Sequence, residues 1–262
     1  MRGGFRESRI ENRLLREAIR REEAEKLKKL LGNIREVLER QGVPVDQNCR
    51  IDIGAFRDVY GKKVENDIEL INEIKGGTEE SLLTDGERFE VLKTIVFYKF
   101  LHKRFIIVRA SFYDDVSNQV DNLIIEKETG NIVCAFDEVS TISGPRLAKK
   151  QERFLINNIN GARVKYGVLS TRDGLKKGEI ENIPIFYLAL PPENIDKGIE
   201  NLTSLEEISD YERKLWEYFV ATIKNQIARL RLERHLNPTL MTRLLEFEKT
   251  LEELKTKGII FI

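Results

Sequence analysis

The chain has 262 residues, of which 41% are hydrophobic, so it is long enough to fill the core of one large domain. Lysine plus arginine and aspartate plus glutamate each number 44, which gives a formal net charge of zero. Bulk electrostatic attraction to nucleic acid or to a membrane surface is therefore excluded, and any site for a polyanion must be local.

The chain has only two cysteines, Cys49 and Cys134, which indicates a reducing compartment rather than a disulfide-stabilised fold. No leader with an apolar segment opens the sequence, and no run of about 18 apolar residues occurs. We therefore expect a cytoplasmic protein that does not contact membranes. Abundant Glu, Lys, Arg and Ile are typical of a thermophilic source.

The first predicted element is one long charged helix over residues 8–41. Gly42 and Pro44 are expected to terminate it. Its apolar residues are spaced three and four apart, as in a heptad seam. These are Ala24, Leu27, Leu31, Ile34 and Leu38. The seam predicts a packing face against another helix, either within the chain or in a second copy, and the alternative is an arm that binds nucleic acid.

Two more helices are predicted before the first strand. One begins near Phe56 and ends at Gly76-Gly77, and it includes Glu65. The next spans residues 87–102 and is strongly apolar, so we expect it to be buried against a sheet. From Phe105 the pattern changes to β-branched and aromatic residues, which predict strands.

A hairpin is predicted over residues 119–140, with a turn signal at Thr129-Gly130. A two-residue turn there would place Asp121 directly opposite Glu138, on the same face. A turn shifted by one residue pairs Asp121 with Ser140 but keeps Glu138 on that face. Only an odd loop length would put Asp137 in the place of Glu138.

Two neighbouring carboxylates repel each other unless a positive charge lies between them. Mg²⁺ or Mn²⁺ is the natural occupant, because a hard divalent cation accepts one or two protein carboxylates and completes its shell with water and phosphate oxygens. The alternative is that Asp121 and Glu138 are two solvated acids on a sheet surface.

After the hairpin, the predicted elements are a helix, two strands and a helical C-terminal segment. A helix is predicted from Pro145 to a stop at Gly161, and strands from Val164 and from Ile183. Residues from 205 onward are predicted to be helical and can pair with residues 8–41. This gives an N-terminal helix over 1–44, an α/β core over 45–192 and a C-terminal helical segment over 193–262.

The order helix, three-strand meander, helix and strand, with acids near the start of the second strand and the end of the third, resembles the restriction-endonuclease-like or PD-(D/E)xK nuclease superfamily. The segments that carry the resemblance are VDNLI, ETGN, IVCAFDEVS, AKKQERF and VKYGV, within residues 56–190. The long N-terminal helix is similar to that of uncharacterised prokaryotic members with a coiled-coil lead-in. The resemblance implies an α/β fold with a restriction-endonuclease-like core.

Carried over by position, the resemblance makes Asp121 and Glu138 metal ligands and matches Glu65 to the acid on the first core helix. The family's lysine follows its acid by two positions, and Ser140 stands there in this chain. A hydroxyl cannot supply the positive charge that orients water and stabilises the transition state.

Lys149 and Lys150, in the helix after Pro145, are the predicted substitutes for that lysine. Adjacent helix positions diverge by about 100°, so at most one of them faces inward, and both can instead be solvated. Gln151 is predicted to lie on the core-facing side of the same helix.

The leading prediction is a metal-dependent nuclease with DNA as the expected substrate. One alternative is a catalytically degenerate nuclease fold that binds nucleic acid or protein. In that case Ser140, in place of the family's lysine, would reflect the loss of catalysis. Another is a coiled-coil structural protein that forms a homodimer through its terminal helices. A zinc site or a hydrolase triad lacks its parts, because His102 and His235 have no partner at ligand spacing.

Overall fold

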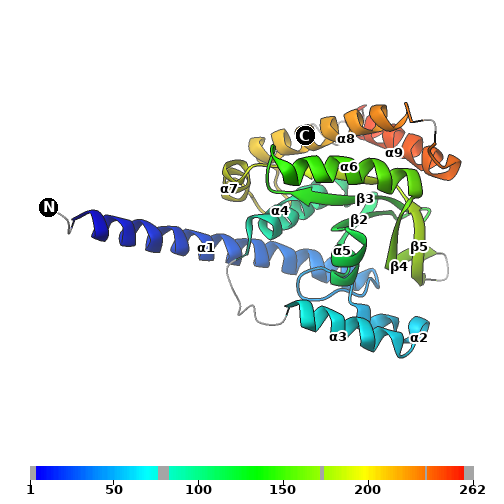
Figure 1. Ribbon diagram of the computed structural model, residues 1–262, viewed down its shortest axis with the longest axis horizontal. Coiled ribbons are helices and arrows are strands. Elements are labelled where there is room, and N and C mark those ends of the chain that lie inside the picture. Colours follow the sequence, from blue (N-terminus) through cyan, green and yellow to red (C-terminus); the bar gives the residue numbers. More distant parts are fainter. Residues whose placement is uncertain (1–3, 76–82, 172–173, 234, 257–262) are drawn as a thin grey trace.

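The computed structural model describes residues 4–75, 83–171, 174–233 and 235–256, and it shows a mixed α/β body from which one long helix projects (Figure 1). The predicted α/β class and the long N-terminal helix are confirmed. The elements before the first strand are α1 (Gly4–Arg40), the short 3₁₀ helix η1 (Ile53–Phe56), α2 (Arg57–Tyr60), α3 (Lys63–Lys75) and α4 (Asp85–Leu101).

A four-stranded mixed sheet forms the centre of the body, in the order β1-β2-β3-β6. The first three strands are an antiparallel meander, and the last runs parallel to β3. The strands are β1 (Phe105–Arg109), β2 (Asn122–Glu126), β3 (Ile132–Val139) and β6 (Ile185–Ala189). Two helices lie between them in the chain, α5 (Phe112–Asn118) after β1 and α6 (Pro145–Asn160) after β3.

A separate antiparallel ribbon of β4 (Ala162–Thr171) and β5 (Gly174–Ile183) stands between α6 and β6. The segment VKYGV, matched by resemblance to the fourth core strand, lies in this ribbon, and β6 takes the place beside β3 instead. The continuous apolar run of β6 is typical of a buried parallel strand, whereas β5, the partner of β4 in the ribbon, alternates between exposed and half-buried residues.

The two faces of the sheet carry different helices. Phe136 of β3 packs edge-on against Phe97 of α4 and also contacts Phe186 of β6, whereas Tyr187 packs against Phe154 of α6. Side chains alternate along a strand, so Glu138 lies on the α4 face with Phe136, and Asp137 lies on the α6 face. The helices that follow β6 are α7 (Pro192–Glu200), α8 (Asp210–Leu230) and α9 (Pro238–Thr256).

Helix α4 is the central helix of the body, as its apolar sequence predicts. A capping box of Thr84 and Glu87 begins it, and all of its residues from Arg88 to Leu101 are buried. It contacts β1 and β3 on one side and α1, α7 and α8 on the others. Any charged residue of this helix must therefore find its partner inside the protein.

The second half of α1 is docked on the body, and its first half is not (Figure 1). Leu27 and Ile34 are fully buried, and Lys26 donates a hydrogen bond to the carbonyl of Ile199 in α7 at 2.8 Å. The longer C-terminal helices α8 and α9 lie on the sheet, where α8 contacts β6 and α9 contacts β3. In the described part of the chain, no helix has the length and hydropathy needed to cross a bilayer.

Candidate metal-binding and catalytic site

The β2–β3 hairpin has a longer turn than predicted. Four residues, 127–130, separate Glu126 from Asn131, and the pairing slips by one residue because Ile124 pairs with Cys134 while Ile125 pairs with Ile132. Val133 is the extra residue of this β-bulge. The predicted two-residue turn, with Asp121 directly opposite Glu138, is therefore wrong, and the regular pairing ends with Asn122 opposite Phe136.

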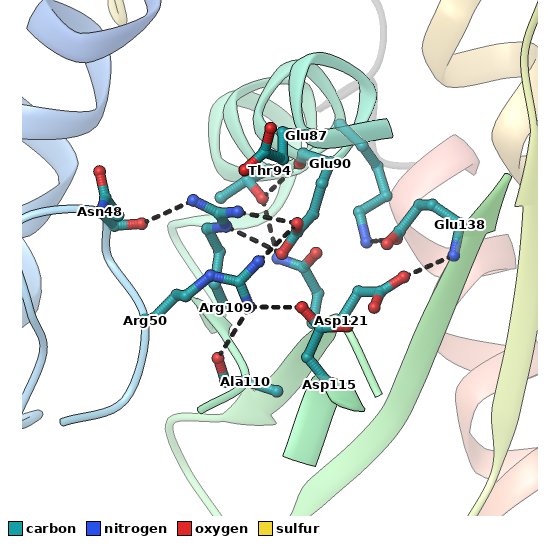
Figure 2. Close-up of polar contacts among 12 residues, drawn as sticks. Asn48, Arg50, Glu87, Glu90, Thr94, Arg109, Ala110, Asp115, Asp121 and Glu138 are labelled. Carbon is teal, nitrogen blue, oxygen red and sulfur yellow. Dashed lines mark hydrogen bonds and ion pairs between the residues drawn. The ribbon is translucent and has the colours of Figure 1, made fainter. Parts of the chain in front are cut away.

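Asp121 and Glu138 meet all the same, through a different contact. The Asp121 carboxylate accepts a hydrogen bond from the backbone N–H of Glu138 at 2.7 Å, as Figure 2 shows. The backbone of Asp121 is held on both sides, since its N–H donates to Phe136 and its carbonyl accepts from Ala110, each at 2.8 Å. Asp121 is 9% exposed and Glu138 8%, so both acids lie at the edge of the core.

The Glu138 side chain faces α4 and forms an ion pair with Lys93. The Lys93 side chain is fully buried and also lies over the ring of Phe136, 4.7 Å from its centroid. Burial lowers the pKa of the Lys93 ammonium to about 7, against the opposing effects of Asp121 and Glu90. A lysine in this state can hold a proton or release one near neutral pH.

A second buried lysine on the same helix shows what a structural lysine looks like. Lys99 pairs with Glu212 and also donates to the Thr203 hydroxyl and to the carbonyls of Thr203 and Glu207, at 3.0–3.1 Å. Its hydrogen-bonding capacity is filled. Within the described ranges, Lys93 donates to one acceptor, Glu138, and otherwise lies over the rings of Phe136 and Phe97. The two lysines therefore differ in how many of their donors are satisfied.

Glu90, one turn before Lys93 in α4, is held between two arginines. Arg50 donates to Glu90 at 2.8 Å and Arg109 at 2.9 Å, and Figure 2 shows both guanidinium groups facing its carboxylate. Burial alone would raise the pKa of Glu90, but Arg109 and Arg50 outweigh burial and hold this pKa at about 2. Glu90 is therefore a fixed negative charge beside Asp121.

Asp115 of α5 completes the cluster. It forms an ion pair with Arg50 at 3.0 Å, and its side chain is hydrogen-bonded to that of Asp121. Burial, and next the charge of Asp121, raise the pKa of Asp115 to about 8. Burial and the charge of Glu90 likewise raise the pKa of Asp121. Two carboxylates in contact cannot both ionise freely, so the raised pKa of Asp115 keeps a proton between Asp115 and Asp121 at neutral pH.

The predicted substitutes for the missing lysine lie on the other face of the sheet. Lys150 of α6 forms an ion pair with Asp137, and its charge also acts on Asp121. Lys149 is exposed, as expected for the neighbour of an inward-facing residue. Gln151 donates a hydrogen bond to the Tyr187 hydroxyl at 3.3 Å. Ser140, half-buried, directly follows the last residue of β3.

Glu65 is not part of this cluster. It lies in the first turn of α3, half exposed, and pairs with Arg57 at 2.7 Å. Helix α3 contacts η1, α2 and α5, whereas α4 is the helix that packs on the meander. The predicted place of Glu65 beside Asp121 and Glu138 is therefore corrected, and the acid on the helix that packs on the meander is Glu90.

The donor set at Glu138 and Asp121 fits a hard divalent cation. Glu138 Oε2 is buried and has no hydrogen-bond partner, which is costly for a carboxylate oxygen unless something else occupies it. Across the described ranges, no three carboxylate, imidazole or thiol groups converge into a full ligand set. A cation here would take its remaining ligands from water and substrate, as Mg²⁺ prefers.

Sequence reasoning missed Glu90, Lys93, Arg50 and Arg109. A signal for two of them is present, since Glu90 and Lys93, like Arg88 and Lys99, are charged residues in a strongly apolar helix that was predicted to be buried. A charged residue on such a helix needs an internal partner, and that need marks a candidate site.

No protein-family model, no curated protein and no solved structure matches the chain. The geometry around Asp121 and Glu138 is therefore the basis for any statement about function.

Proposed function

We propose that the protein is a metal-dependent phosphodiesterase of the restriction-endonuclease-like class that cleaves nucleic acid, with DNA as its substrate. The observation that carries the proposal is the meeting of Asp121, Glu138 and Lys93 at one end of the sheet, with an unsatisfied oxygen on Glu138. Two carboxylates and an ammonium group are the parts that phosphodiester hydrolysis needs.

Asp121 and Glu138 would hold Mg²⁺ or Mn²⁺. Such an ion, when bound, lowers the pKa of a coordinated water and neutralises charge on the phosphate. The Glu138 N–H fixes the orientation of the Asp121 carboxylate against the backbone of β3, at the residue whose side chain would be the second ligand.

Lys93 would supply the charge that Ser140 cannot. Its ammonium lies at Glu138, the residue that the resemblance makes the acid of the motif, and it reaches this place from α4 rather than from β3. With a pKa lowered to about 7 it can position the attacking water, accept its proton, or stabilise the developing phosphorane charge.

Glu90, Arg50 and Arg109 would act as positioning residues. The two arginines come from different segments, Arg50 from the loop after α1 and Arg109 from the end of β1, and they meet on Glu90. Arg50 continues to Asp115, whose side chain contacts Asp121. The chain of contacts links α4, β1 and α5 to Asp121 and restricts its side chain.

The arrangement of elements supports the same class. Helix α4, the meander β1–β2–β3, helix α6 and strand β6 follow the order of the core that the sequence resembles, once the ribbon β4–β5 is treated as an insertion. The acids then lie near the start of β2 and near the end of β3, in agreement with the resemblance.

The test is cleavage of plasmid, linear duplex, single-stranded DNA and RNA in Mg²⁺, Mn²⁺ or EDTA. Asp121→Asn and Glu138→Gln are expected to reduce metal-dependent cleavage by about 100-fold or more. The matched control is Asp137→Asn, one residue away on β3 but on the α6 face. Undiminished cleavage by both site variants rejects the proposal.

Ser140 favours a second candidate function, a nuclease fold that binds nucleic acid without cleaving it. In that case wild-type protein binds DNA or RNA but releases no product at any metal concentration, and Lys93→Met leaves binding unchanged.

A further inference from the structure

One face of α1 changes its chemistry halfway along the helix. In the docked half this face is aliphatic and buried, and in the projecting half it is basic. The buried residues are Leu27, Leu31, Ile34 and Leu38, and the basic ones are Arg6, Arg9, Arg13, Arg16 and Arg20. Because both sets are spaced alternately three and four residues apart, they lie within an arc of about 80° on the helix.

Arg20 shows that the two sets share a face. It pairs with Asp85 at the start of α4 at 2.8 Å, and Glu23 nearby pairs with Arg88 at 2.6 Å. Helix α4 is also a helix on which α1 packs, together with α7. By helix geometry the arginine positions before Arg20 continue the docking face, along the part of α1 that projects from the body (Figure 1).

Side chains are described from residue 14 onward in the projecting half, and over residues 14–19 all are exposed except the half-buried Glu17. Leu14 is 59% exposed and Leu15 60%, and Arg16 is also exposed. Arginines three and four residues apart repel each other and weaken a helix. Such a stripe is favourable when a ligand with regularly repeated negative charge lies along it.

The phosphate backbone of a nucleic acid meets this requirement. Successive arginines of the stripe are about 5 Å apart along the helix axis, which is comparable to the distance between phosphates. The guanidinium group is planar and presents paired donors that match phosphate oxygens. Charge complementarity therefore specifies a polyanion.

Two other occupants fit less well. A bilayer surface needs a continuous apolar face, but Glu7, Glu11 and Glu22 interrupt the side of the helix that carries Leu14 and Leu15. A second copy of the arm would set arginine against arginine. A contact between the basic face of one copy and the acidic side of another is head-to-tail and does not close into a dimer.

We propose that the projecting half of α1 is an arm that binds the phosphate backbone of nucleic acid through Arg6, Arg9, Arg13 and Arg16. The choice of nucleic acid among polyanions rests on the proposed function. A strand held on this face is led along the docking side of α1 toward the body.

The experiment measures binding of the full-length protein to labelled single-stranded and duplex DNA by fluorescence anisotropy, in EDTA, over a range of salt concentrations. The arm variant is Arg9→Gln/Arg13→Gln/Arg16→Gln, since glutamine keeps the helix propensity. The slope of log affinity against log salt is expected to fall by about 2 units for single strands and about 3 for duplex. Far-UV circular dichroism checks that helix content is unchanged.

The matched control removes the same charge from other faces of the same helix, with Arg21→Gln/Lys28→Gln/Lys29→Gln, all at exposed positions. Its slope is expected to change by less than about 1 unit. Equal losses in the two variants would show a general charge effect and overturn the proposal. An unchanged slope in the arm variant would also overturn the proposal. Loss of binding to phosphatidylglycerol vesicles in that variant would then identify a membrane surface as the partner, and a changed mass in solution would identify a second copy of the chain.

Binding in EDTA and cleavage in metal keep the two proposals apart. A reduced slope in the arm variant without cleavage by the wild type supports the arm and rejects the nuclease. Cleavage by the wild type with an unchanged slope in the arm variant rejects the arm alone.

Discussion

Lys93 and Glu138 form an ion pair between α4 and β3 in which the lysine side chain is fully buried and that of the glutamate is 3% exposed. A buried pair of this kind contributes little net stability compared with two apolar residues, because desolvation offsets the attraction. Glu138 also keeps one oxygen without a partner. The pair is therefore better explained by a function than by the needs of the core.

The first prediction concerns which lysine serves the site. Lys93→Met is expected to reduce cleavage by about 100-fold or more, because the ammonium at Glu138 is lost. Lys150→Met is expected to have an effect of less than about 10-fold, since Lys150 pairs with Asp137 on the other face. Initial rates under saturating Mg²⁺ measure both.

Two further variants make this comparison decisive. Lys149→Met, at the exposed neighbour of Lys150, controls for loss of a charge from α6. Lys93→Arg keeps the charge but cannot release a proton near neutral pH, so partial activity would show that charge is the main contribution. If Lys150→Met abolishes cleavage and Lys93→Met does not, Lys150 of α6 is the lysine that serves the site, and the assignment of Lys93 is wrong.

The sequence predicted the elements well where one local signal determined them. Pro145 begins α6 and Gly161 follows its last residue, and the apolar run over residues 87–102 became the buried helix α4. The expectation that Asp121 and Glu138 lie close together also came from the sequence, because Asp121 directly precedes β2 and Glu138 lies near the end of β3 in one hairpin. These features depend on neighbours in the chain.

The features that were missed depend on contacts between distant segments. The bulge at Val133 is set by how β3 fits β2, and no residue type marks it. Arg50 and Glu90 are 40 residues apart in the chain, and Lys93 and Glu138 are 45 apart. Spacing rules could search for a lysine only near the motif, so they stopped at Lys149 and Lys150.

The second prediction is that a divalent cation stabilises the folded protein. A ligand that binds only the native state raises the free energy of unfolding by about 2.7 kcal/mol at 100 times its dissociation constant. Mn²⁺ or Mg²⁺ is therefore expected to raise the melting temperature of the wild type but not that of Glu138→Gln. Differential scanning fluorimetry measures both.

Glu138→Gln is expected to fold, because Lys93 can lose its proton when its carboxylate partner is removed. Asp137→Asn is the control, and it should show the same shift with metal as the wild type. A shift of equal size in Glu138→Gln would place the cation elsewhere.

The third prediction is a pH dependence of stability that comes from Glu90. Arg109 and Arg50 lower its pKa from 4.5 to about 2 in the folded protein, against the effect of burial. A depressed pKa means that the unfolded chain binds a proton first, so this contribution is fully present above pH 4.5 and is lost as the pH falls toward 2. Urea unfolding between these pH values, in EDTA, measures the loss.

Glu90→Gln removes this dependence and also destabilises the protein at neutral pH by about 3–5 kcal/mol, because two buried arginines lose their common partner. The control is Glu69→Gln, at an exposed position of α3. The assignment fails if Glu90→Gln retains the wild-type slope of stability against pH over this window.

The last prediction tests the packing of α7 against α4 and α8, and it compares one glycine of α7 with one of α1. A Cβ built on Gly198 of α7 would lie 2.5 Å from Leu92 Cδ2 in α4 and 3.2 Å from Leu215 Cδ1 in α8, whereas one on Gly32 of α1 meets nothing within 4 Å. Gly198→Ala is therefore expected to lower the free energy of unfolding by about 1–3 kcal/mol through overpacking. Gly32→Ala should raise it by up to about 1 kcal/mol, since alanine is the better helix former. Chemical denaturation measures both, and a gain in stability from Gly198→Ala would contradict the close approach of α7 to α4.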